Sequence, residues 1–315
     1  MEKMGISVLL STYNGEKYLN QQLDSLFSQT YEIFEIIARD DGSQDKTLEI
    51  LRSYNIKIID SKENLGAKGS FGALLEYAVQ NNASEYFMFC DQDDVWDSNK
   101  IEKTLAKMHD IEKSLPDSPI LVNTDLKVVD EELKVLDNSM WNYQQINPKL
   151  NTLNRLLIQN TITGCTVMIN KKLAQISLQI PDEALMHDWW IGLVASKFGR
   201  IEYIHDSTIQ YRQHTGNNVG AKRFSYVNII KNILKKRFSI FFNGNLHKKH
   251  LAKNIEQARA FLSIYKENLG EVDIQVLEDL ATIESKSFWQ KRKILLRHKL
   301  LKQGLINNIL LFLRI

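Results

Sequence analysis

Three carboxylates stand within four residues, immediately after a short apolar run at 86–90; they are Asp91, Asp93 and Asp94. The apolar run predicts a buried strand, and like charges at its end repel one another unless a positive group lies among them. Magnesium and manganese prefer oxygen ligands and are commonly held by one or two carboxylates together with substrate phosphates. The cluster therefore predicts a divalent metal site, with a solvated acidic turn that caps the next helix as the alternative.

Strand and helix patterns alternate along the N-terminal third of the chain. Apolar runs predict strands at 5–11, 34–38, 56–60 and 86–90, and amphipathic patterns predict helices at 18–29, 46–54, 70–80 and 98–108. This alternation is typical of a doubly wound α/β sheet whose strands are mostly parallel. Ligands of such sheets bind at the carboxyl ends of the strands.

Polar clusters follow three of these predicted strands. Thr12, Tyr13 and Asn14 follow the first strand, Asp40 and Asp41 the second, and Asp91, Gln92 and Asp93 the fourth. Each cluster taken alone is also typical of a turn or a helix cap. Because the carboxyl ends of parallel strands share one edge of the sheet, the three clusters together predict a binding site there.

The pattern becomes less regular after residue 119. We expect strands at 120–126, 161–169, 201–204 and 208–212, a strand or hairpin at 128–136, and helices at 150–157 and 186–198. Gly164 interrupts the strand-like segment 161–169, and a glycine there permits a bend or the close approach of the backbone to a ligand. Asp188 stands at the start of a helix, where a carboxylate is often a simple N-cap.

The formal charge divides the chain into two regions. Residues 1–221 contain 21 Lys/Arg and 31 Asp/Glu, a net charge of −10, whereas residues 222–315 contain 19 Lys/Arg and 7 Asp/Glu, a net charge of +12. We expect a catalytic domain at 1–221 and a basic helical region at 222–315. The helices predicted in this region are 227–242, 252–268, 272–287 and 288–315.

The cysteines and the termini bear on the compartment. Cys90 and Cys165 are the two cysteines of the chain, which excludes a disulfide framework and indicates a reducing compartment. The N-terminus leads directly into a predicted strand, without the pattern of a signal peptide. No uncharged apolar run is long enough to predict a transmembrane helix, so we expect a cytoplasmic protein.

These residue types suit an enzyme that handles a nucleoside diphosphate. Such an enzyme must bind the base, neutralise the pyrophosphate and position the reacting atom. Asp40 and Asp41 can accept the imino N–H of a pyrimidine, because an ionised carboxylate only accepts hydrogen bonds. Asp91 and Asp93 suit the ribose and the metal.

The second half of the chain offers a base and a cationic group. A displacement at a sugar carbon needs a general base for the acceptor hydroxyl, and Asp188 is our candidate. Trp189 and Trp190 would offer apolar surface to a sugar ring and raise the pKa of Asp188 by desolvation, although tryptophan is also typical of a core. Arg212 and His214 alternate on an extended segment and would face the same side. We expect Arg212 to meet the pyrophosphate and neutral His214 to bind the metal, with a loop histidine without a ligand as the alternative.

The motifs together resemble those of family 2 glycosyltransferases with the GT-A fold. The resemblance rests on segments 7–14, 39–45 and 91–96 in this order and spacing, and it covers residues 5–215. Segments 186–190 and 211–218 resemble a narrower group, the bacterial rhamnosyltransferases that build cell-wall and capsular rhamnose polysaccharides. The resemblance implies an inverting transferase with one metal ion, Mg²⁺ or Mn²⁺, that uses dTDP-L-rhamnose as donor and a lipid-linked saccharide as acceptor.

The resemblance also implies roles for individual residues. It assigns Thr12, Tyr13, Asp40 and Asp41 to the nucleotide, Asp93 to the metal and Asp188 to the catalytic base. Family members commonly carry an acidic pair at the base, whereas here the preceding residue is His187. The expected site also contains Asn14, Lys68, Asp91 and Gln92 at the nucleotide, His214 at the metal, Arg212 at the pyrophosphate, and Trp96, Asp125, Gly164, Cys165, Trp189 and Trp190 at the sugar or acceptor.

The last thirty residues are basic and apolar. Residues 286–315 contain 8 Lys/Arg and no Asp or Glu. A basic amphipathic helix can lie in the headgroup region of an anionic membrane, which suits a lipid-linked acceptor and places the protein at the inner face of the cell membrane. The alternative is a helical subdomain that packs on protein, including a second copy in a homodimer.

Other functions remain open at this point. A transferase of a UDP-linked galactose, glucose or N-acetylhexosamine would carry the same motifs. A nucleotidyltransferase also uses aspartates and magnesium but usually opens with a glycine-rich phosphate loop, whereas Gly15 is the one glycine in residues 12–16. A non-catalytic scaffold would bind the nucleotide-sugar without turnover. Nucleic-acid binding is disfavoured because the basic C-terminal residues alternate with aliphatic rather than stacking side chains.

Overall fold

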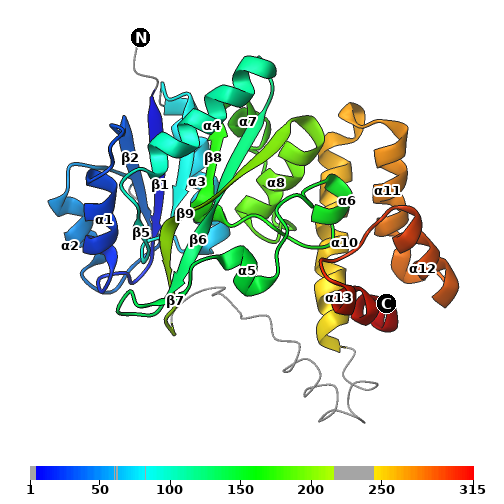
Figure 1. Cartoon of the computed structure of the whole chain (residues 1–315). Helices are drawn as coiled ribbons and strands as arrows, with labels where there is room; N and C mark the ends of the chain where they lie inside the picture. The colour runs from blue at the N-terminus through cyan, green and yellow to red at the C-terminus, as the bar shows by residue number, and fades with distance from the viewer. Residues whose placement is uncertain (1–4, 60, 62, 82, 216–244) are drawn as a thin grey trace. The chain divides into compact units, whose positions relative to one another are not determined.

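The computed structural model describes residues 5–59, 61, 63–81, 83–215 and 245–315, which form two compact units (Figure 1). The first unit lies within residues 1–142, 162–180 and 186–221, and the second within 143–161, 181–185 and 222–315. The chain therefore leaves the first unit twice before its C-terminal region begins. The described part of the basic segment, residues 245–315, falls in the second unit.

One mixed β-sheet forms the centre of the first unit. Its strands are β1 (Ile6–Thr12), β2 (Glu35–Asp40), β3 (Lys57–Ile59), β4 (Tyr86–Cys90), β5 (Val95–Trp96), β6 (Ile120–Val129), β7 (Val135–Asp137), β8 (Val167–Asn170) and β9 (Arg200–Arg212). Their order across the sheet is β3-β2-β1-β4-β8-β6-β9-β5, and β7 pairs with β6. Strands β1 to β4 pair in parallel, as do β6 and β9, whereas β8 runs antiparallel to both β4 and β6. The predicted doubly wound mixed α/β sheet is confirmed.

Helices cover this sheet and bury their apolar faces against it. They are α1 (Leu19–Phe27), α2 (Thr47–Ser53), α3 (Gly66–Asn81), α4 (Lys100–Ser114), α5 (Met140–Gln144), α7 (Lys171–Ile176) and α8 (His187–Phe198). Helix α3 packs on β1 and β2, α4 packs on β6 and β9, and α8 packs on β9. In α3 the buried residues Phe71, Leu74, Leu75 and Ala78 recur at helical spacing, which is why this face turns toward the sheet.

The second unit is helical in its described part. It contains α6 (Leu153–Leu156), α10 (Asn245–Tyr265), α11 (Glu271–Ala281), α12 (Phe288–Arg297) and α13 (Leu305–Arg314). The segment 143–161 is held there by side-chain amides: Asn254 of α10 donates to the carbonyl oxygens of Leu157 and Ile158, both at 2.9 Å. Gln303 donates to the carbonyl oxygen of Asn147 at 3.1 Å. Among the helices of the described ranges, none is long and apolar enough to cross a membrane.

Several predicted elements differ from those observed in the first unit. The predicted strands 201–204 and 208–212 are one strand, β9, because the register against β6 passes from Ile204 to Ser207 through a bulge. The predicted strand 161–169 begins only at Val167. It is preceded by the 3₁₀ turn η1 (Gly164–Thr166), in which Thr166 Oγ1 donates to the carbonyl oxygen of Thr163. Such side-chain bonds favour a turn over a ladder. The segment 128–136 is a hairpin, formed by the end of β6 and by β7.

The C-terminal helices are shorter than predicted. The predicted helix 288–315 is two helices, because Lys299 and Gly304 adopt positive φ angles of 52° and 80° between them. The predicted helix 272–287 ends at Ala281 and continues into the 3₁₀ turn η3 (Ile283–Ser285). Another 3₁₀ turn, η2 (Lys266–Asn268), follows α10. The predicted helix 227–242 lies outside the described residues.

Candidate active site

A cluster of acidic side chains forms at the carboxyl end of β4. Asp91 and Asp94 follow this strand, and their carboxylate oxygens and the Cys165 sulfur all lie within 4.8 Å of one another. Cys165 reaches the cluster because β8 runs antiparallel to β4, with Met168 opposite Met88. The residues just before β8 therefore lie beside those just after β4. The three side chains form a group that can hold a metal ion.

When no cation is present, the carboxylates of this cluster resist ionisation. Burial and, to a lesser extent, the negative charges of Asp93 and Asp188 raise the pKa of Asp91 to about 7, against a hydrogen bond from the Cys165 thiol that lowers it. Burial and the negative charges of Asp93 and Asp91 also raise the pKa of Asp94 well above its usual value. Desolvation and like charges both disfavour the ionised form. A divalent cation would remove both penalties, so the donor set fits a metal.

Asp93 and His214 form a pair next to this cluster. His214 Nε2 lies 2.7 Å from Asp93 Oδ2, and its ring packs against that of Tyr18 at a tilt of 39°, with 4.9 Å between the centroids. Strand β5 pairs antiparallel with β9, with Val95 opposite Gln210. This pairing brings the residues after β9 back to the end of β4. Two residues expected at the metal thus lie in direct contact.

Arg212 supports the acidic segment from inside the protein. Its backbone N–H donates to Asp94 Oδ1 at 3.1 Å, and its Nε donates to the carbonyl oxygen of Asp93 at 2.8 Å. The other guanidinium nitrogens donate to the carbonyl oxygen of Glu131 and to Gln21. The side chain is buried, and its donors are used by the protein. The structure therefore assigns Arg212 to holding the strand ends together rather than to open contact with a pyrophosphate, which corrects the expectation.

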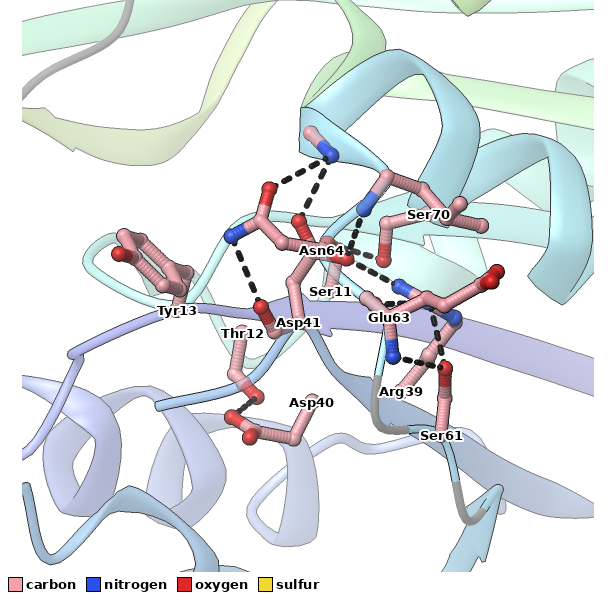
Figure 2. Close-up of polar contacts among 12 residues, drawn as sticks. Ser11, Thr12, Tyr13, Arg39, Asp40, Asp41, Ser61, Glu63, Asn64 and Ser70 are labelled. Atoms are coloured by element: carbon pink, nitrogen blue, oxygen red, sulfur yellow. Dashed lines mark hydrogen bonds and ion pairs between the residues drawn. The ribbon is translucent and has the colours of Figure 1, made fainter. Parts of the chain in front are cut away.

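The ends of β1 and β2 are joined by a buried carboxylate (Figure 2). Asp40 accepts a hydrogen bond from Thr12 Oγ1 at 2.9 Å and another from the backbone N–H of Ser43 at 2.9 Å. The Ser43 hydroxyl also donates to Asp40. Thr12 and Asp40 lie opposite each other in the β1–β2 ladder. Both side chains are buried, so they shape the floor of this end of the site.

Asp41 connects the same edge to the start of α3. Its carboxylate accepts the backbone N–H groups of Leu65 and Gly66, both at 2.8 Å, and forms a buried ion pair with Arg39. Asn64 donates to the carbonyl oxygen of Asp41 at 2.9 Å. Figure 2 shows Asn64 above Asp41, on the side toward Tyr13. Asn64 is exposed and presents a polar group at this edge of the sheet. The sequence analysis did not select this residue. The signal available was the turn Asn64-Leu65-Gly66 after the third strand.

The loop after β1 is held by side-chain hydrogen bonds. Gln92 accepts from the backbone N–H of Tyr13 at 2.8 Å and donates to the Tyr13 carbonyl oxygen at 2.9 Å. Asn14, whose φ is 47°, accepts from the backbone N–H of Gln44 at 2.8 Å. The Tyr13 side chain is 48% exposed. Gln92 and Asn14 thus act as braces that leave the Tyr13 ring free to face a ligand.

Asp188 lies in the first turn of α8 and belongs to the same electrostatic group. Its charge is one of the causes that raise the pKa of Asp91, so the two carboxylates interact across the site. Asp188 Oδ1 accepts the backbone N–H of Trp189 at 2.6 Å. Most of the Asp188 side chain is buried. The candidate base and the acidic end of β4 are therefore brought together by the fold.

The family described as "Glycosyl transferase family 2" matches residues 7–176. The chain belongs to glycosyl transferase family 2. Solved structures of TarS from S. aureus, one of them in complex with UDP-GlcNAc, share the fold of this transferase. That complex contains residues 1–349 of TarS; it gives a TM-score of 0.53 at 18% identity, and the match covers 91% of this chain and 83% of that TarS fragment.

Curated relatives carry glycosyltransferase names. An uncharacterized glycosyltransferase of Rickettsia typhi is 29% identical over 251 residues, 77% of this chain and 76% of the relative. The dTDP-rhamnosyl transferase RfbG of Shigella flexneri is 26% identical over 301 residues, 90% of this chain and 94% of the relative. The UDP-Glc:alpha-D-GlcNAc-diphosphoundecaprenol beta-1,3-glucosyltransferase WfgD of Escherichia coli is 26% identical over 178 residues, 55% of this chain and 63% of the relative.

Three residues expected at the sugar or acceptor of the transferase are core residues. Trp190 is completely buried. Trp96 is nearly so, with the Lys100 ammonium 4.6 Å from its ring centroid. Asp125 is buried and accepts hydrogen bonds from the Ser139 hydroxyl and from the backbone N–H of Trp141. These side chains offer no surface to a ligand, which corrects their assignment. Their residue types could not reveal this, because aromatic and acidic residues are found both in cores and at ligand sites.

The remaining expected residues lie around the acidic cluster or at the site's edge. Gly164 is buried against His187, and Cys165 is buried beside Asp91 and Asp94. Trp189 is partly exposed beside Asp188, and Lys68 is partly exposed in the first turn of α3. Burial lowers the pKa of His187 to about 3, so the imidazole that precedes the candidate base is neutral at physiological pH.

Lys100 is a buried cation that the sequence analysis did not select. It opens α4 and is completely buried. Burial lowers its pKa to about 8, while the negative charge of Asp94 is among the groups that raise it. Its positive charge therefore offsets part of the negative charge of the cluster. In the sequence it resembles an ordinary surface lysine of an amphipathic helix, and only the fold shows its burial.

Proposed function

We propose that this protein is an inverting, metal-dependent glycosyltransferase. The observation that carries the proposal is the interaction of Asp188 with the acidic cluster at the end of β4. A transferase of this kind needs a general base within reach of the site that holds the donor diphosphate. Asp188 of α8 would be that base, and the acidic residues after β4 would belong to that site.

The metal would be Mg²⁺ or Mn²⁺. Asp93 and His214 would hold it, beside Asp91 and Asp94, and carboxylates suit both of these ions. When bound, the ion would neutralise the negative charge of the donor diphosphate and of the leaving group. The chain's own residues would bind the rest of the donor: Tyr13 and Asn64 lie exposed at the edge next to the buried Asp40 and Asp41, where the nucleoside would lie.

Asp188 would act as the general base of a single displacement. The acceptor hydroxyl oxygen forms a bond to the anomeric carbon, and the bond from that carbon to the diphosphate oxygen breaks. The nucleoside diphosphate leaves with the electron pair, and the hydroxyl proton passes to the Asp188 carboxylate. Because the pKa of His187 is about 3, its neutral imidazole is a weak base. Asp188 would therefore be the base of this pair.

The donor would be dTDP-L-rhamnose and the acceptor a lipid-linked saccharide at the inner face of the cell membrane. The rhamnosyl donor is supported by the similarity to RfbG, which extends over 90% of the chain. A UDP-sugar is the alternative, supported by the name of WfgD and by the UDP-GlcNAc complex of TarS. The lipid-linked acceptor is supported by the name of WfgD, which specifies a diphosphoundecaprenol saccharide.

Thermal unfolding of the full chain with dTDP-, UDP- and GDP-sugars, each with and without Mg²⁺ or Mn²⁺, tests the donor and the metal. A ligand at 100 times its dissociation constant adds about 2.7 kcal/mol to the free energy of unfolding. We expect the largest stabilisation from dTDP-rhamnose with metal and its loss in Asp93→Ala. A larger shift with a UDP-sugar would overturn the rhamnose assignment and keep the transferase. No shift with any donor would contradict the proposed function.

The variant Asp188→Asn separates a transferase from a binding scaffold. We expect the same donor-dependent thermal shift as in the wild type and loss of turnover, because an amide cannot accept the hydroxyl proton. General base catalysis typically contributes 10²–10⁴-fold, so turnover should fall by about that factor. Asp45→Asn, a change at an aspartate that binds Thr47 and Glu16, is the matched control and should retain turnover. Unchanged turnover in Asp188→Asn would show that Asp188 is not the general base.

A further inference from the structure

The side chains of the last two helices, α12 and α13, carry charge of one sign only. Residues 286–315 contain 8 Lys/Arg and no Asp or Glu. In α12 the side chains of Lys293 and Arg297 are exposed. An exposed surface of this kind attracts an anionic partner, such as a negatively charged bilayer.

Exposed apolar side chains form a stripe along α13, at Leu305, Ile309 and Leu313. They are 77%, 48% and 73% exposed, respectively. Because they follow one another at intervals of four residues, they lie along one face of the helix. A contiguous row of exposed apolar side chains on a protein surface marks a site of contact with a membrane or with another protein.

Helix α12 combines both properties on one face. Trp289 is 77% exposed and Leu296 is also exposed, and Lys293 lies between them at helical spacing. Arg292 of α12 donates to the carbonyl oxygen of Phe312 in α13. The two helices are therefore in contact, and their exposed side chains belong to one C-terminal element within the second unit.

We propose that α12 and α13 form a docking surface for an anionic lipid bilayer. Tryptophan, leucine and lysine on an exposed amphipathic helix suit the headgroup boundary, where apolar side chains enter the acyl region and basic ones meet lipid phosphates. A protein interface fits less well, because lysine is depleted from interface cores. Helix α13 contains 10 residues and is about 15 Å long, half of a bilayer core of about 30 Å, so it would lie in the plane of the surface. The proposal does not depend on the proposed transferase activity.

Co-sedimentation of the full-length protein with vesicles tests the proposal. We expect binding to phosphatidylcholine vesicles that contain phosphatidylglycerol and little binding to pure phosphatidylcholine. High salt should weaken the binding, since the Debye length falls from about 10 Å at 0.1 M to about 3 Å at 1 M. Equal binding to both kinds of vesicle, or none to either, would overturn the proposal.

Paired variants separate the surface from the rest of the protein. Lys293→Glu/Arg297→Glu should lower the affinity for anionic vesicles by at least about tenfold, and Leu305→Asn/Ile309→Asn/Leu313→Asn should lower it as well. The controls are Lys266→Glu in η2 and Val272→Asn in α11; Lys266 is exposed and Val272 is 77% exposed. Both controls should bind like the wild type, and circular dichroism should show the same helix content in all four.

The oligomeric state distinguishes lipid from a second copy of the chain. Sedimentation equilibrium without lipid should give the same mass for the wild type and for the variant with three asparagines. If that variant instead changes from dimer to monomer and binds vesicles like the wild type, the stripe is a dimer interface and the lipid proposal is overturned.

Discussion

At the scale of single residues, the site consists of side chains that hold one another in place. Three of them are buried and form hydrogen bonds to backbone groups of the protein: Asp40, Asp41 and Arg212. These bonds join the ends of strands to the loops beside them. Tyr13 and Asn64 are left exposed at the same edge. The buried residues thus set the geometry, and the exposed residues would provide the contacts to the proposed nucleotide.

Gln92 should act by bracing Tyr13. Gln92→Ala removes two hydrogen bonds to the Tyr13 backbone, worth about 0.5–1.5 kcal/mol each, and should weaken donor binding measured by calorimetry. Gly15→Ala should weaken it too, because the added methyl group would lie 2.3 Å from Gln92 Oε1. In the double variant the clash is absent, so Gly15→Ala should cost little on the Gln92→Ala background. Additive losses would contradict the brace.

The raised pKa of Asp91 predicts a pH-dependent stability. Its native pKa of about 7 exceeds the usual 3.8, so the native state binds more protons than the unfolded state between these values. Stability of the metal-free wild type should therefore fall as pH rises through this window. The Asp91→Asn variant has no carboxyl group to ionise here, so its free energy of unfolding should not fall in this way. The difference in free energy of unfolding between the variant and the wild type should therefore increase in favour of the variant from about pH 5 to pH 8. Curves that run parallel across the window would contradict the assignment.

At the scale of elements, close backbone contacts decide where helices and strands join. Gly199 links α8 to β9, and a methyl group there would lie 2.0 Å from the carbonyl oxygen of Pro119. The backbone N–H of Arg200 donates to that same oxygen at 2.9 Å. This contact fixes the start of β9, and β9 in turn brings Arg212 and His214 to the acidic cluster.

Gly199→Ala should therefore destabilise the protein by about 1–3 kcal/mol, the usual cost of forcing extra volume into a packed site. Gly72→Ala is the matched control, because the nearest atom to its added methyl group is at an ordinary 3.8 Å. That substitution lies inside α3 and should stabilise by about 0.5–1 kcal/mol. Urea unfolding of both variants gives the two free energies. A neutral Gly199→Ala would show that the junction can relax.

At the scale of the whole molecule, opposite charges belong to different parts of the chain. The acidic residues 1–221 contain the candidate site, and the basic residues 222–315 contain the proposed lipid-binding surface. A transferase built in this way can bind a soluble donor with one part and the surface that carries its acceptor with another.

The two activities should therefore separate. The variant Leu305→Asn/Ile309→Asn/Leu313→Asn should turn over a lipid-linked acceptor in anionic vesicles more slowly than the wild type. Its thermal shift with donor and metal should be unchanged, because these side chains lie outside the unit that contains the site. Val272→Asn should match the wild type in both measurements. A loss of the donor-dependent shift would mean that the helices affect the site itself.

The sequence alone determined the α/β class and the position of the polar clusters after the parallel strands β1, β2 and β4. It could do so because strand and helix periodicity and the polar clusters at 12–14, 40–41 and 91–94 are local patterns. Only the tertiary structure decided that Trp96, Asp125 and Trp190 are core residues, that Lys100 is buried, and that Cys165 joins Asp91 and Asp94. Burial and the meeting of distant segments depend on how β8, β9 and α8 pack on β4, and no local pattern encodes that packing.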